Sequence, residues 1–116
     1  MKRIAILACA LSMIFSAQAA SAAEPGLDVI KDLGRLNGQA LACGQKDTAA
    51  WIKVLMLTHA PKTRSYGEAY EAGTQETFAA HSRSLPCPDK AASAVRLEDV
   101  TAHLKATFPV TSPAAK

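Results

Sequence analysis

Two cysteines constrain what this chain can fold into more than any other feature. Cys43 and Cys87 remain of the three cysteines once a predicted export signal, which contains Cys9, is set aside. Two cysteines that reach an oxidising compartment together commonly form a disulfide. This bond would join positions 44 residues apart, which on chain-entropy grounds stabilises a fold by roughly 4 kcal/mol. We therefore predict a Cys43–Cys87 disulfide.

The first 22 residues have the organisation of a secretory signal peptide. Lys2 and Arg3 precede an apolar run, residues 4–15, and small residues follow. The run is shorter than the roughly 20 apolar residues that a transmembrane helix needs. We expect cleavage after Ala22, with Ala19 as the alternative, and a periplasmic protein that is not inserted in the membrane.

Export also removes most of the basic character of the chain. The whole sequence has 13 Lys and Arg against 10 Asp and Glu. Loss of Lys2 and Arg3 leaves 11 against 10, a net charge of about +1, so no basic face argues for a nucleic-acid partner. The remaining residues, about 94, suit one small domain.

Apolar residues recur at helical spacing in two segments of the first half. The first segment runs from Gly26 to Cys43, and Gly44 follows it where a left-handed residue commonly ends a helix. The second segment follows Asp47, a good N-cap residue, and stops before Pro61. We predict a helix over each segment.

Two more helices are predicted in the second half. One begins at Ser65 with the capping-box pattern Ser-x-x-Glu, reaching Glu68, and extends to about residue 83. The last begins near Asp89 and ends at Phe108. The sequence thus predicts an all-α, four-helix bundle-like domain over residues 23–109, with a disordered tail over residues 110–116.

The predicted second helix is apolar almost all round, with Trp51, Ile52, Val54, Leu55 and Leu57 among its residues. A helix of this kind is either central in the fold or covered by a partner. Uncovered apolar surface would favour a protein-binding function.

Small residues follow one side of the first predicted helix at every fourth position: Gly34, Gly38 and Ala42. They favour close approach of another helix, with the third helix as the candidate. A shallow groove for a partner is the alternative interpretation.

The residues of a metal or catalytic site do not occur in recognisable spacings. The candidates stand singly in the sequence: Cys43, Cys87, His59, His81 and His103. Zinc sites usually pair their ligands at short spacing, and no nucleotide, hydrolase, zinc-protease or haem motif is present. We expect no metal, no cofactor and no enzymatic activity; an enzyme would have to combine His81 or His103 with distant carboxylates.

A weak anion or small-molecule site is conceivable before the third helix, whose N-terminal end carries partial positive charge. Its candidate residues are His59, Lys62, Arg64, Tyr66 and Tyr70. A solvated basic loop with two half-buried tyrosines explains the same residues.

The function favoured by the sequence is non-enzymatic binding of another protein, as an accessory subunit, an inhibitor or immunity factor, or a chaperone-like protein. In size, export signal and two-cysteine architecture the chain resembles, in general features only, the small acid-stress chaperones of the periplasm. That resemblance implies loosening of the fold in acid.

Overall fold

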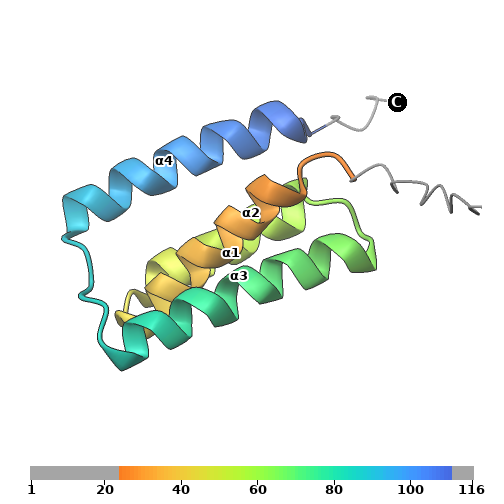
Figure 1. Ribbon diagram of the computed structural model, residues 1–116. Helices are drawn as coiled ribbons and strands as arrows, with labels where there is room; N and C mark the ends of the chain where they lie inside the picture. Colours follow the sequence, from red (N-terminus) through yellow and green to blue (C-terminus); the bar gives the residue numbers. More distant parts are fainter. Residues whose placement is uncertain (1–23, 111–116) are drawn as a thin grey trace, which may run out of the picture.

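The computed structural model describes residues 24–110 and contains four α-helices (Figure 1). Their bounds are Leu27–Ala42 for α1, Lys46–His59 for α2, Arg64–Arg83 for α3 and Lys90–Thr107 for α4. The predicted all-α fold class is confirmed. The predicted signal peptide and all of the predicted tail except Val110 lie outside the described residues.

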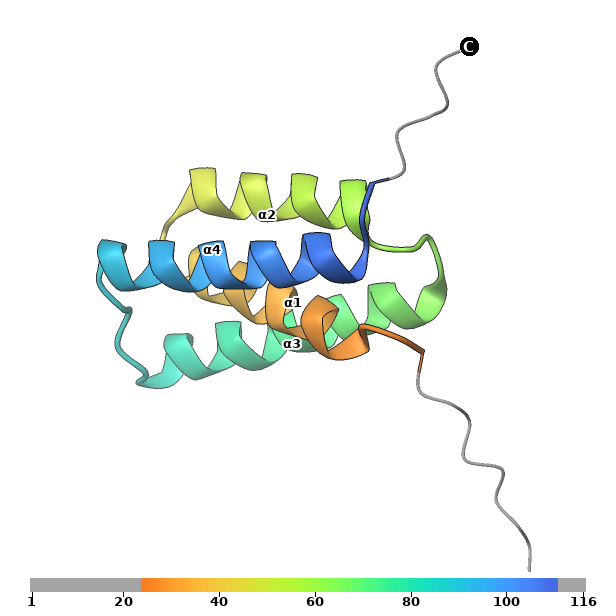
Figure 2. The same cartoon turned by 90° about the horizontal axis from the view of Figure 1, so that it is seen from above.

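The central helix is α1, which contacts each of the other three (Figures 1 and 2). It supplies five of the eleven buried hydrophobic residues of the core: Val29, Ile30, Leu33, Leu36 and Ala40. The second helix, α2, buries only Ile52 and Leu55. Of the two alternatives for this nearly all-apolar helix, a central position is wrong, because its apolar residues point in every direction and only one side meets the core. Cover by a partner stays a prediction.

The backbones of α1 and α3 lie directly against each other. A Cβ added at Gly34 would collide with the carbonyl oxygen of Tyr70, and one added at Gly73 would collide with the carbonyl oxygen of Lys31. Gly38 is equally close to the backbone at Thr74. The predicted close packing along this glycine side of α1 is confirmed, and no room for a partner remains there.

The end of α1 and the start of α4 lie where the sequence predicts them. Gly44 has a φ of 72°, and the backbone N–H of Gln45 donates to the carbonyl of Ala40, which is the Schellman pattern that favours glycine. At the start of α4 the Asp89 carboxylate accepts from the backbone N–H of Ala92 at 2.7 Å.

The predicted caps of α2 and α3 are wrong. Helix α2 begins one residue before Asp47, so its N-cap residue is Gln45. The N-cap residue of α3 is Thr63, and the expected capping box does not form, because Glu68 pairs with Arg64 and Ser65 donates to Glu24. At the start of α3, side-chain partners outside the local pattern replaced the capping box.

The disulfide between Cys43 and Cys87 is present, and the two Cα atoms lie 5.8 Å apart. Cys43 is the C-cap residue of α1, and Cys87 lies in the connection that leads into α4. The bond therefore joins the end of the central helix to the start of the last one, as an exported protein would permit. Among residues 24–110, none of the helices combines the length and the apolar character required to cross a membrane.

Replacing Gly34 with alanine should destabilise the fold, although alanine favours helix. The added methyl group meets the α3 backbone, so we expect a loss of about 1–3 kcal/mol in the free energy of unfolding. Gly67→Ala is the matched control, because a Cβ there meets nothing within 4 Å; it should stabilise α3 by up to about 1 kcal/mol. Urea denaturation measures both, and equal effects of the two changes would contradict the close approach.

Removing the disulfide should cost roughly 4 kcal/mol of stability, since it closes a loop between residues 44 apart in the chain. Chemical denaturation of Cys43→Ser/Cys87→Ser against the oxidised protein measures this loss. If the double substitution changed neither the helical circular dichroism nor the unfolding midpoint, the disulfide would contribute little to stability.

Candidate functional site

A groove with two hollows runs between α2 and α4. The first hollow, of about 640 Å³, lies where both helices begin, and its lining includes Lys46, Asp47 and Lys90. The second, of about 430 Å³, is lined by Trp51 of α2 and by α4 residues that include Glu98 and Lys105. Ala94 and Leu97 line both hollows, so they form one continuous groove.

An apolar stripe starts at Trp51, which lines the second hollow, and runs over the exposed side of α2. Trp51, Val54 and Leu57 are spaced three apart, so they are neighbours on the helix surface. Their side chains are 48%, 48% and 59% exposed. Single exposed apolar residues are ordinary, whereas a contiguous apolar surface beside a hollow is typical of a binding site.

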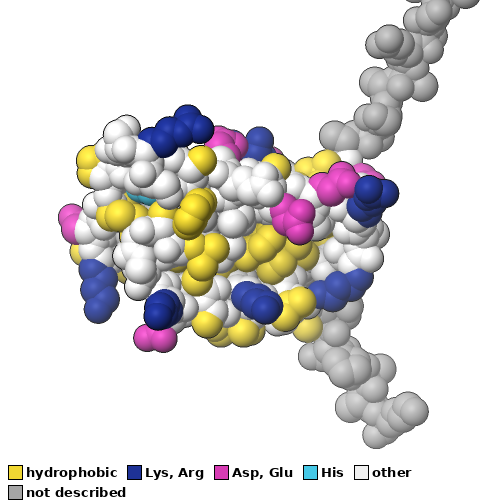
Figure 3. Space-filling view, turned by 90° about the horizontal axis from the view of Figure 1, so that it is seen from below, with side chains coloured by type: hydrophobic (Ala, Val, Ile, Leu, Met, Phe, Trp, Pro, Cys, Tyr) yellow, Lys and Arg dark blue, Asp and Glu magenta, His cyan; other side chains and the backbone are white. Residues whose placement is uncertain are grey.

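The groove exists because α4 touches α2 only slightly. The two helices lie side by side in Figure 2, yet their backbones come close at few points. On the opposite face, seen in Figure 3, hydrophobic side chains form a band with Lys and Arg side chains along its lower edge. Apolar surface is thus exposed on more than one face, and the α2/α4 face is the one with a described groove.

Two of the predicted anion-site residues hold the end of the bundle together. His59 Nδ1 lies 2.9 Å from the carbonyl oxygen of Phe108, at the end of α4. Tyr66 is buried; its hydroxyl donates to the carbonyl of Pro25 at 2.7 Å, and its ring meets that of Phe108 edge to face at 5.5 Å. These contacts give both residues a role within the fold.

The other three predicted residues also contact their own chain or lie apart from the groove. Lys62 donates to the carbonyl of Leu57, and Arg64 pairs with Glu68 at 2.8 Å. Tyr70 is half-buried, and burial raises the pKa of its phenol above the ordinary value, because the charged phenolate loses solvation. None of the five predicted residues lines either hollow of the groove.

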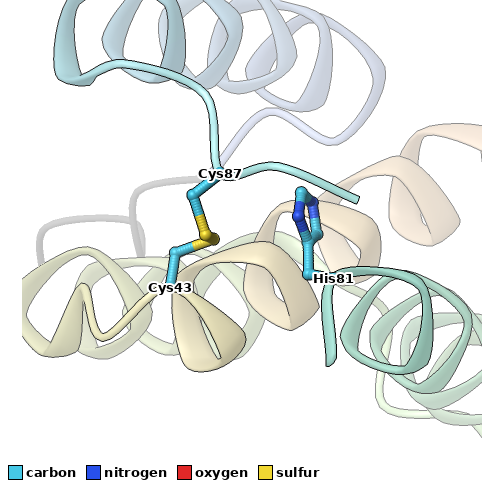
Figure 4. A group of neighbouring side chains, drawn as sticks. All are labelled: Cys43, His81 and Cys87. Atoms are coloured by element: carbon cyan, nitrogen blue, oxygen red, sulfur yellow. A yellow bond between two sulfur atoms is a disulfide. The ribbon is translucent and has the colours of Figure 1, made fainter. Parts of the chain in front are cut away.

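The structure adds His81 to the neighbourhood of the disulfide (Figure 4). One ring nitrogen of His81 and the two sulfurs all lie within 4.8 Å of one another. His81 is in the last turn of α3, six positions before Cys87. Sequence reasoning missed this cluster, because the spacing from His81 to Cys87 matches no ligand pattern and the distance of His81 from Cys43 depends on how α3 lies on α1.

Comparison of the chain with protein-family models, with curated proteins and with solved structures finds no match. The functional argument therefore depends on the residues themselves.

The half-buried phenol of Tyr70 should make the fold sensitive to alkaline pH. Its folded pKa is raised, so its contribution to stability is complete below the unfolded pKa of about 10 and is lost as the pH rises through the folded pKa. Denaturation midpoints measured from pH 8 upward should fall more steeply for the native protein than for Tyr70→Phe. Parallel curves for the two proteins would contradict this role for Tyr70.

Proposed function

We propose that this protein is an exported, non-enzymatic protein-binding factor of the periplasm, and that its α2/α4 groove receives an amphipathic helix of a partner protein. The observation that carries the proposal is the uncovered apolar stripe of Trp51, Val54 and Leu57 beside that groove. Burial of such a stripe removes apolar surface from water, which favours binding by about 25 cal/mol for each Å² buried.

A helix suits the shape of this surface. Two neighbouring helices with a groove between them are a common receptor for a third helix, which inserts apolar side chains at every third or fourth position. Leu97 and Ala94 give the floor of the groove apolar character along its length. The occupant therefore needs an apolar face of several turns.

The charges of the groove favour an orientation of the partner. Both α2 and α4 begin at the larger hollow, where Lys46 and Lys90 stand and where both helix dipoles are positive. The Asp89 carboxylate at this end caps α4, which leaves Asp47 as the opposing charge in the lining. We expect the partner to place acidic residues, or the C-terminal end of its helix, at this hollow.

The anion-binding alternative has weaker support. Its residues make the intrachain contacts described above, and they line neither hollow of the α2/α4 groove. Accessory subunit, inhibitor or immunity factor, and chaperone-like protein remain the forms that protein binding can take.

The test compares two exposed valines. Val54→Glu places a charge in the apolar stripe, whereas Val95→Glu places one on α4 at a residue that lines neither hollow and is 60% exposed. Both should change the free energy of unfolding by no more than about 0.5 kcal/mol. The partner protein is first captured from periplasmic extract and then purified. Val54→Glu should weaken its binding at least about tenfold, the loss of affinity expected when a central apolar contact worth more than 1 kcal/mol is removed.

Trp51 provides a direct readout, because it is the one tryptophan of the sequence and lies in the groove. Titration with the purified partner should shift its fluorescence to the blue as the ring leaves water. A partner that binds both valine variants equally and leaves Trp51 emission unchanged binds elsewhere. Failure to retain any partner protein would remove the proposed function.

A further inference from the structure

We propose that Cys43, Cys87 and His81 form a zinc-binding site when the disulfide is reduced. In the oxidised chain the sulfurs are bonded to each other and cannot serve as thiolate ligands. The site would therefore exist in one redox state of the protein and be absent in the other.

The geometry already brings the three ligand atoms together. All lie within 4.8 Å of one another, whereas ligand atoms around a tetrahedral zinc ion, with Zn–S of about 2.3 Å and Zn–N of about 2.0 Å, are roughly 3.5 Å apart. Once the disulfide is reduced, the two sulfurs would move apart to this spacing and the ring nitrogen would approach them. Two thiolates and one imidazole are ligands that zinc prefers, and three protein ligands leave a fourth position for water or another ligand.

A backbone carbonyl holds the ring of His81 in place. Its Nδ1 atom lies 3.1 Å from the carbonyl oxygen of Leu85. A carbonyl only accepts hydrogen bonds, so Nδ1 carries the proton and Nε2 keeps its lone pair. A backbone carbonyl bonded to the second ring nitrogen is the usual support of a zinc-bound histidine, because it fixes the tautomer and the ring orientation.

The backbone around the cysteines restricts how far they can part after reduction. Cys87 lies between Pro86 and Pro88, and proline limits both its own φ and the conformation of the residue before it. Cys43 follows the last turn of α1, and its backbone N–H donates to the carbonyl of Gln39. Nearby, the Gln39 side chain donates to Ser93 of α4 at 3.2 Å, a second link between α1 and α4 beside the disulfide.

The chemistry balances with a dithiol as the reductant. The dithiol passes two electrons and two protons to the Cys43–Cys87 bond and becomes a disulfide itself, which leaves two protein thiols. Zinc then displaces one proton from each thiol and takes the imidazole as its third protein ligand. Thiol–disulfide exchange with a disulfide as the oxidant would take two electrons from the pair, re-form the Cys43–Cys87 bond and release the ion, while the oxidant takes up two protons and becomes a dithiol.

The experiment adds Zn²⁺ to oxidised and reduced protein in competition with a chromogenic chelator, using a phosphine reductant that does not hold zinc. The reduced native chain should bind one Zn²⁺ per molecule and the oxidised chain none. His81→Ala should weaken binding to the reduced chain at least about tenfold. His103→Ala is the matched control, an exposed histidine of α4 outside the cluster, and it should bind as the native chain does.

Circular dichroism of the same samples distinguishes a site in the fold from ligands on an unfolded chain. Zinc should preserve or restore the helical signal of the reduced native protein, and the helical signal of reduced His81→Ala should recover less. Any of four results would overturn the proposal: no Zn²⁺ bound after reduction, equal binding by His81→Ala, binding without helical structure, or equal binding by the oxidised chain.

Discussion

The contact on which the rest of the structure depends is the close approach of the α1 and α3 backbones. Gly34, Gly38 and Gly73 remove the side chains that would hold the two helices apart. Asn37 and Thr74 add a hydrogen bond across this interface, at 3.2 Å. Because α3 packs on the glycine side of α1, the leucine and isoleucine side chains of α1 can pack against α2 and α4. This makes α1 the centre of the domain.

The last helix is held mainly through its two ends. At its start the disulfide and the hydrogen bond from Gln39 to Ser93 join it to α1. At its finish the ring of Phe108 meets Tyr66 and covers Gly26, whose φ of 76° and lack of a Cβ leave space for that ring. Between these ends Val100 and Leu104 reach the core, while the side toward α2 remains an open groove.

This arrangement connects the two proposed activities in space. Gly44 and Lys90, which line the larger hollow, each lie close in sequence to one of the bonded cysteines. In the proposal, a change in the redox state of Cys43 and Cys87 would act on the segments that shape one end of the groove. In a domain of this size a single covalent link is a large part of the net stability, which is commonly about 5–15 kcal/mol.

Local sequence signals predicted the helices well and their caps unevenly. Apolar periodicity placed all four helices, because a helix repeats every 3.6 residues whatever it packs against. Gly44 and Asp89 ended and began helices as expected, since a left-handed residue and a carboxylate cap act within a few residues. The capping box at Ser65 failed, because Glu24, distant in sequence, accepted the serine hydroxyl.

By itself the sequence determined the helical fold class, the disulfide partners and the tight side of α1, because each follows from a periodicity, a count or a small residue. Only the tertiary structure decided that α1 rather than α2 is central, that the stripe from Trp51 to Leu57 is uncovered, and that His81 lies beside the cysteines. The physical reason is common to all three. Each depends on which helix faces pair across long stretches of chain, and that choice is a competition among several apolar faces that no local pattern resolves.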